Sequence, residues 1–180
     1  MDWKEKFHVV ISSDEINDEI EADFYLKDAG AKNDFLEKIK LEYPFVTDDY
    51  LNFLRMTDGA DIAQCSFLET NNFDDFASQY GQTYSKKTWM PFGFEAGGDP
   101  LLLHFSGKIA MGDGKANHEN VVFLANNFSD FLNNVLMGSK YASIFRIEED
   151  NFSEFYQNEV EDDPWLAFLV KRNWVEIKKQ

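Results

Sequence analysis

Residues 89–132 decide how the middle of this chain folds, and they read WMPFGFEAGGDPLLLHFSGKIAMGDGKANHENVVFLANNFSDFL. Residues 88–94 are apolar but contain a proline, which cannot donate a hydrogen bond within a sheet, so we expect a strand at a sheet edge or at a β-bulge. Two apolar runs within 101–111 flank a Ser-Gly pair and predict a hairpin with a two-residue turn. Residues 62–69 and 120–125 predict further strands.

Helix patterns lie on both sides of these strands. Asn33 and Thr47 stand at the N-cap positions of two predicted helices, and Gly59, which tolerates a positive φ, ends the second. Residues 72–80 and 128–136 carry apolar side chains at i, i+3, i+4 and i+7, which predicts two further amphipathic helices.

One helix-start signal occurs three times, at Asn72, Asn127 and Asn151, each followed by Phe, an acid at the third position and a second Phe. The asparagine can cap the first amides of a helix, and the acid can reach back to the cap. We therefore expect a helix to begin at each copy. Asn127 and Asn151 also match the N-glycosylation sequon, but without an export signal we expect neither to be modified.

The two ends of the chain give less regular patterns. Residues 7–11 are apolar and are predicted as a short strand, whereas the acid-rich residues 14–28 fit either a marginal helix or a strand with a loop. Asp163 followed by Pro164 is typical of a helix start, because proline suits the first helical position. Residues 174–177 are predicted as a final strand.

The composition restricts the class of partner. The chain has 33 acidic against 17 basic residues, a formal net charge of -16, which disfavours nucleic acid and anionic membranes and favours basic partners. Hydrophobic residues make up 44% of the 180 residues, enough for the core of one domain. The chain begins without a signal-peptide pattern, has a single cysteine and lacks a run of about 20 apolar residues, so we expect a cytoplasmic protein.

The polar residues predict neither a catalytic constellation nor a metal site. His8, His104 and His118 are far apart, and the chain has no paired cysteines or His-x-x-x-His motif from which to build a zinc site. Cys65 has no basic neighbour in sequence and is interpreted as a core residue. The glycines within 112–115 lack the Walker spacing and predict a turn. We therefore expect no cofactor, no metal and no enzymatic activity.

Several weak features follow one another in a fixed order. They are the helix Thr47–Thr57 closed by Asp58-Gly59, the strand Trp89-Met90-Pro91-Phe92-Gly93, the turn Gly97-Gly98-Asp99 before three leucines, the turn at Gly107, and Val121–Ala125 leading into Phe128-Ser-Asp-Phe-Leu132. In this order they resemble the SUKH superfamily, the Smi/Knr-like domain of bacterial toxin-immunity proteins and of a fungal cell-wall regulator. We expect a single domain over 1–180, with a family-like core at about 33–137 and an acidic helical extension over 138–180.

The resemblance implies an α+β fold, in which helices pack against a central, mostly antiparallel sheet. It also implies a non-enzymatic binding protein, because bacterial members are inferred to neutralise a cognate toxin, often a nuclease, and share no catalytic residues. For Asp99, in the glycine-glycine-aspartate signature, a turn or capping role is expected over a binding role. The alternative function is a regulatory or scaffolding domain with a host-cell protein partner. The resemblance predicts no oligomeric state.

The segment 148–163 is the candidate surface for a basic protein partner, because it carries eight acids and no base. The candidate contact residues are Glu148, Glu149, Asp150, Glu154, Glu159, Glu161, Asp162 and Asp163. The alternative interpretation is a solvated linker and helix face without a partner. Three aromatic neighbours, Phe155, Tyr156 and Trp165, would anchor the contact if exposed, although packing in the core is the simpler expectation.

Overall fold

The computed structural model describes residues 1–115 and 120–177 and has an α+β fold around one antiparallel sheet. Within these residues, seven strands pair in sequence order, so each strand contacts its immediate neighbours along the chain. The strands are β1 (Phe24–Leu26), β2 (Ala60–Ile62), β3 (Cys65–Phe67), β4 (Trp89–Glu95), β5 (Pro100–His104), β6 (Ile109–Met111) and β7 (Val122–Ala125). The predicted fold class is thereby confirmed.

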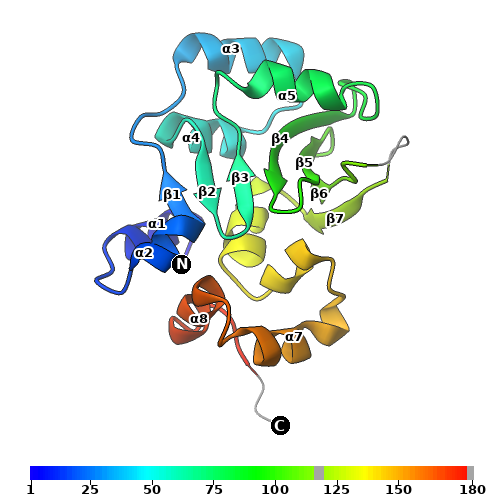
Figure 1. Cartoon of the computed structure of the whole chain (residues 1–180). Helices are drawn as coiled ribbons and strands as arrows, with labels where there is room; N and C mark the ends of the chain where they lie inside the picture. Colours follow the sequence, from blue (N-terminus) through cyan, green and yellow to red (C-terminus); the bar gives the residue numbers. More distant parts are fainter. Residues whose placement is uncertain (116–119, 178–180) are drawn as a thin grey trace.

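Helices surround this sheet at both ends of the molecule. The helical elements of the described residues are α1 (Trp3–Ile11), α2 (Asp18–Asp23), α3 (Asn33–Glu42), α4 (Asp48–Met56), α5 (Phe73–Tyr80), α6 (Phe128–Asp130), the π-helix η1 (Phe131–Leu136), the 3-10 helices η2 (Tyr141–Phe145) and η3 (Glu149–Asn151), α7 (Phe152–Glu159) and α8 (Pro164–Lys171). Figure 1 shows α3 and α5 at one end and α7 and α8 at the other. None of these helices is long and apolar enough to cross a bilayer.

Strand β4 lies inside the sheet, between β3 and β5, and contains the predicted bulge. Its register with β5 shifts between Pro91 and Gly93, which is a β-bulge. Pro91 has no backbone N–H to donate, and it lies at this bulge and outside the residues of β4 that pair with β3. The edge position that we also considered for this strand is therefore wrong. Gly93 is required by close packing, since a Cβ there would lie 2.5 Å from the backbone oxygen of Ser66 in β3.

Residues 62–69, predicted as one strand, instead contain the turn of a hairpin. Strands β2 and β3 pair across Ala63, which adopts a positive φ of 56°, a conformation that apolar periodicity does not reveal. The Ser66 hydroxyl donates to the Asp61 carboxylate at 2.6 Å across the two strands. The other predicted hairpin is present as β5–β6, but its predicted two-residue turn is wrong, because residues 105–108 separate the two strands. The predicted strand near 120–125 is present as β7.

The prediction of a strand at 7–11 is wrong, because these residues form the second half of α1. Asp2 and Glu5 form a capping box, with reciprocal hydrogen bonds of 2.9 and 2.7 Å, so the helix begins before the apolar run. Trp3, Phe7 and Val10 are all buried at helical spacing. In the acid-rich segment that follows, both the predicted helix and the predicted strand are present. The helix is α2, which Asn17 caps, and the strand is β1, directly after it.

Helices α3, α4 and α5 follow the predicted apolar spacing, but their predicted side-chain caps differ. Thr47 is the N-cap of α4, although its hydroxyl does not bond the helix, and Asn33 lies one residue inside α3. Of the three repeated start signals, Asn127 caps its helix, accepting from the Asp130 amide at 2.8 Å. Asn72 and Asn151 already have helical backbone angles, so their side chains form no such bond.

The C-terminal segment, expected as an appended extension, packs into the same core as the sheet. Trp165 in α8 is fully buried, stacks on Phe24 of β1 with centroids 5.5 Å apart, and donates from Nε1 to the Leu136 carbonyl at 3.0 Å. The predicted helix start at Asp163 is confirmed. Residues 174–177 form no strand, contrary to prediction, although Val175 is buried.

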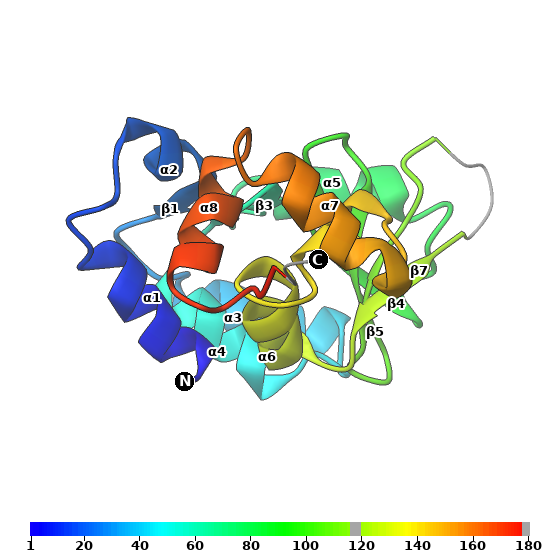
Figure 2. The same cartoon turned by 90° about the horizontal axis from the view of Figure 1, so that it is seen from below.

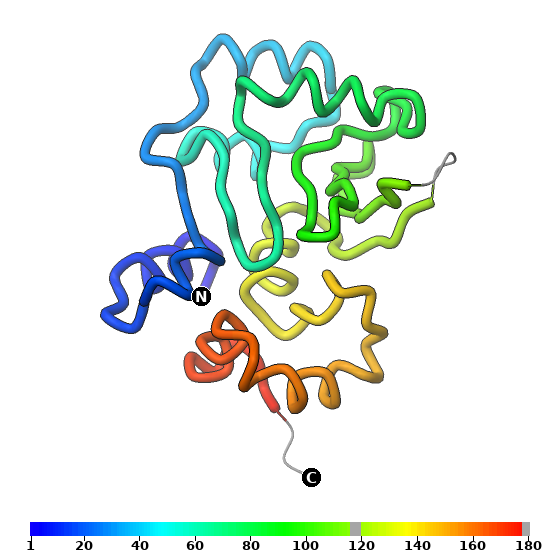
Figure 3. The backbone as a smooth tube through the Cα atoms, viewed as in Figure 1, coloured from blue at the N-terminus to red at the C-terminus, as the bar shows by residue number. Residues whose placement is uncertain are grey.

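The N-terminal segment packs against η1 and the C-terminal segment. The Lys6 ammonium donates to the carbonyls of Asn133 and Met137, at 2.7 and 2.5 Å, around the C-terminal end of η1. Arg172 after α8 donates to the Ser13 hydroxyl at 2.7 Å. Figures 2 and 3 show the N-terminal helices α1 and α2 next to α8. The two ends of the chain therefore stabilise each other and the central sheet.

Candidate partner-binding surface

Seven of the eight predicted contact acids are exposed on η3, α7 and the turns around them. We call this set the acidic surface, and its members are Glu148, Glu149, Asp150, Glu154, Glu159, Glu161 and Asp162. The eight residues of α7 span about 12 Å, and the acids lie on this helix, on η3 before it and in the turn after it. Figure 2, which views the molecule from below, shows α7 on the near face beside α8.

The eighth acid, Asp163, has partners within the domain. It is the N-cap of α8, where Oδ1 accepts from the Leu166 amide at 2.9 Å, and its Oδ2 accepts from the Tyr141 hydroxyl at 2.8 Å. Burial raises the pKa of Tyr141, and the neighbouring Asp163 carboxylate raises it further, so the hydroxyl remains a donor. Asp163 therefore serves the fold, and we exclude it from the acidic surface.

The seven exposed acids form no ion pair within the described part of the chain. Some acids elsewhere are compensated: Glu15 pairs with Lys171 and Arg172, and Glu69 pairs with Lys27. The potential over the acidic surface is consequently negative without internal neutralisation, which is the arrangement that steers a basic partner.

The acidic surface continues onto a groove that sequence spacing did not reveal. A depression of about 310 Å³ lies between α2 and α8, and Glu19 and Glu161 both line it. Ile20 and Phe168 supply apolar lining there. Glu19 lies beside the acidic surface because α2 packs against α8, a tertiary contact between segments far apart in sequence.

The three aromatic neighbours of the acids are buried to different degrees. Tyr156 and Trp165 are buried in the core, as we expected, and Phe155 is half-buried. Phe145 in η2 is 38% exposed and lies with its ring centroid 5.1 Å from that of Phe155. The exposed aromatic beside the acids is thus Phe145, which helical periodicity within the tail did not single out.

The family-signature residues lie at turns and in β4, and they do not gather into one site. Gly59 lies between α4 and β2, Trp89 and Pro91 in β4, Gly97, Gly98 and Asp99 in the turn before β5, and Gly107 in the β5–β6 turn. They are distributed along the length of the sheet.

Asp99 fastens three segments together. Its Oδ1 accepts from the Gly114 amide at 3.0 Å, and its Oδ2 accepts from the Arg146 guanidinium at 2.7 Å. The Glu95 carboxylate closes the turn by accepting from the amides of Gly97 and Asp99. Partial burial acts to raise the pKa of Asp99, but the hydrogen bond from Gly114 and the Arg146 charge outweigh it and hold that pKa below its usual value.

Groups that could perform chemistry are dispersed or buried. Burial raises the pKa of the Cys65 thiol, which is 1% exposed, so it is a poor nucleophile. The Nδ1 atom of His104 lies 2.7 Å from the Ser106 hydroxyl, and His8 is exposed on α1. His118 lies outside the described residues. Within those residues, no group of three or more His, Cys, Asp or Glu side chains could hold a metal ion.

Comparison with known proteins agrees with the order of elements along the sheet. The model of the SMI1 / KNR4 family (SUKH-1) matches residues 30–134, from just before α3 into η1. A search of curated proteins gave no match. The matched region holds β2 to β7 and all the signature turns, whereas α7, α8 and the acidic surface lie outside it. The chain belongs to the SMI1 / KNR4 family (SUKH-1).

Proposed function

We propose that this chain is a non-enzymatic immunity protein that neutralises a cognate protein toxin, using the acidic surface as its contact. The observation that carries the proposal is the set of seven exposed acids on η3, α7 and the adjoining turns, which form no ion pair within the described residues. Family membership supports a role in binding a protein, and the net charge of -16 supports a basic partner.

The charge pattern suits a nuclease toxin as the partner. A nuclease cleft must present cations to phosphates, so a surface of carboxylates can occupy or cover it. Long-range attraction then accelerates the encounter, and exposed aromatic side chains such as Phe145 supply apolar contact once the surfaces meet. On this proposal the protein acts in the cytoplasm, without a cofactor and without contacting nucleic acid directly.

The second candidate is a regulatory or scaffolding domain that binds a host-cell protein. It uses the same fold, and the resemblance to a fungal cell-wall regulator favours it. Gene neighbourhood separates the two, because a toxin gene directly upstream is expected only for an immunity protein.

The test is co-purification from the native cell, with identification of the bound protein. The variant replaces Glu154, Glu159, Glu161 and Asp162 with Lys and leaves Asp163, the cap of α8, unchanged. We expect the wild type to retain a basic toxin and the variant to lose it.

A control variant carries the same charge change at the opposite end of the molecule. It replaces Asp28, Asp34, Glu37 and Asp75 with Lys, all exposed on or next to α3 and α5. Equal retention of the toxin by both variants would show that the acidic surface is not the interface. Retention of an acidic or non-toxin protein would contradict the proposed function itself.

A further inference from the structure

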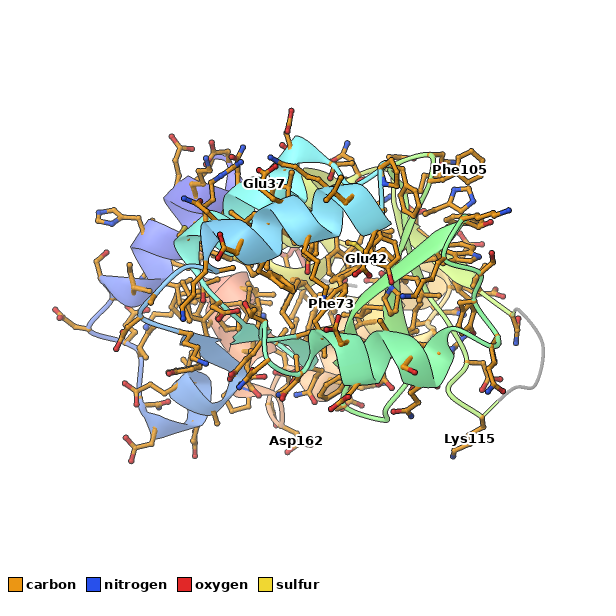
Figure 4. All side chains as sticks on the ribbon, turned by 90° about the horizontal axis from the view of Figure 1, so that it is seen from above. Glu37, Glu42, Phe73, Phe105, Lys115 and Asp162 are labelled. Atoms are coloured by element: carbon orange, nitrogen blue, oxygen red, sulfur yellow. The ribbon has the colours of Figure 1, made fainter. Side chains whose placement is uncertain are left out.

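A second surface, of opposite charge, lies at the end of the molecule that carries the β5–β6 turn. A groove of about 520 Å³ is formed by three segments, and we call it the aromatic groove. Its lining residues are Glu42, Pro44, Phe45, Lys86, Lys87 and Phe105. Phe105, at 58%, is the most exposed of the phenylalanines in the described residues, and Figure 4 shows it at the outer edge of the molecule, well separated from Asp162.

The exposed phenylalanine is held in place by the turn that presents it. The Phe105 amide donates to the Thr88 carbonyl at 2.8 Å, which ties the hairpin to the loop carrying Lys86 and Lys87. The Gly107 amide donates to the His104 carbonyl at 2.8 Å and closes the turn. An exposed aromatic whose backbone is already fixed beside a groove loses less conformational freedom on binding, which favours its use as an interface anchor.

The charges at the rim of the aromatic groove identify the kind of segment that fits it. Glu42 is already engaged, 3.6 Å from the Lys86 ammonium and 3.9 Å from that of Lys38. Lys87 and Lys108 are exposed, and neither forms an ion pair within the described part of the chain. The Lys108 ammonium does not line the groove, because it lies over the ring of Phe123 in β7, 5.4 Å from its centroid.

We propose that the aromatic groove binds a protein segment in which an apolar side chain is flanked by carboxylates. The apolar side chain packs on Phe45 and Phe105, and a flanking carboxylate meets the Lys87 ammonium, since Lys86 is already paired with Glu42. This partner is opposite in charge to the one at the acidic surface, so the domain can hold two different proteins at separate faces. The inference goes beyond the proposed function and does not depend on it.

The test selects peptides from a displayed random library on the full-length chain. Counter-selection on a Phe105→Ala, Lys87→Glu double variant removes peptides that bind elsewhere. We expect enriched sequences in which an aromatic or aliphatic residue is flanked by Asp or Glu. In fluorescence anisotropy, Phe105→Ala and Lys87→Glu should each weaken the best peptide by about tenfold.

Matched controls separate the groove from general effects of size and charge. Tyr25→Ala removes a 54% exposed aromatic at the other edge of the sheet, and Lys32→Glu reverses an exposed lysine without an ion pair in the described residues. Both control variants should leave peptide binding unchanged. The variant with Lys at Glu154, Glu159, Glu161 and Asp162 should also bind the peptide normally, so a negative result for one surface does not count against the other. Circular dichroism confirms that each variant is folded.

Four outcomes would overturn the inference. They are no enrichment, enrichment of basic peptides, peptide binding that survives Phe105→Ala, and binding to phosphatidylserine vesicles without binding to any peptide. Concentration-dependent self-association that Phe105→Ala abolishes, without peptide binding, would assign the groove to a second copy of the chain.

Discussion

Truncation of Trp165 to alanine should destabilise the whole domain, because the C-terminal segment completes the core. The Trp165 side chain is fully buried, its ring centroid is 5.5 Å from that of Phe24 and 5.6 Å from that of Phe168, and its Nε1 donates to the Leu136 carbonyl. Removing a buried tryptophan costs about 3–5 kcal/mol of unfolding free energy, of which the lost hydrogen bond is about 1 kcal/mol. Since a domain has about 5–15 kcal/mol in total, this is a large fraction.

The assay is urea unfolding followed by far-ultraviolet circular dichroism, with Trp174→Ala as the matched control. Trp174 is only half-buried after α8, where it meets Phe168 and lies under the Lys6 ammonium, so its loss should cost about 1–2 kcal/mol. Both variants should unfold in one transition. A loss below about 1 kcal/mol for Trp165→Ala, or a sheet that still unfolds at the wild-type midpoint in a separate step, would refute the single core.

Three further predictions concern stability. Gly93→Ala should lower the thermal midpoint by several degrees, because its Cβ would lie 2.5 Å from a backbone oxygen of β3; an unchanged midpoint would contradict this close approach. Burial lowers the pKa of Lys6 from 10.5 to about 8, so the folded state favours the neutral amine. As the pH is raised from about 8 to 10.5, the unfolding free energy of the wild type relative to that of Lys6→Met should therefore increase by about 2 kcal/mol. A difference that does not change with pH would contradict this prediction. Asp163→Ala should cost about 1–2 kcal/mol in urea unfolding through the lost α8 cap, and Asp162→Ala less than about 0.5; similar losses would assign no special role to the cap.

Apolar spacing in the sequence was sufficient to predict an element where that element is a helix of several turns with one buried face. The apolar faces of α4 and α5 follow from spacing alone, because both helices bury a single face. The run at 7–11 was misleading because its β-branched residues resemble a strand, while the deciding signal, the capping box of Asp2 and Glu5, lies upstream. The π-helical turn at η1 left the apolar faces intact, so periodicity did not distinguish it from an α-helix.

The functional surfaces depended on contacts that no local pattern contains. Seven of the eight predicted acids are exposed, as their charge alone favours, whereas the burial of Trp165 against β1 joins residues from opposite ends of the chain. The sequence pattern does not distinguish Asp163 from the acids beside it. In the structure it has a structural role, because it caps α8 and accepts a hydrogen bond from the Tyr141 hydroxyl. The aromatic groove was not predicted, because three separate segments form it.

The most direct test of the central claim is the association rate of this chain with its co-purified partner, measured at low and at physiological ionic strength. If the acidic surface steers the encounter, the rate of the wild type should fall about tenfold or more across this range. The Glu154, Glu159, Glu161 and Asp162 to Lys variant should associate slowly at both ionic strengths. Equal rates for wild type and variant, independent of salt, would contradict recognition through the acidic surface.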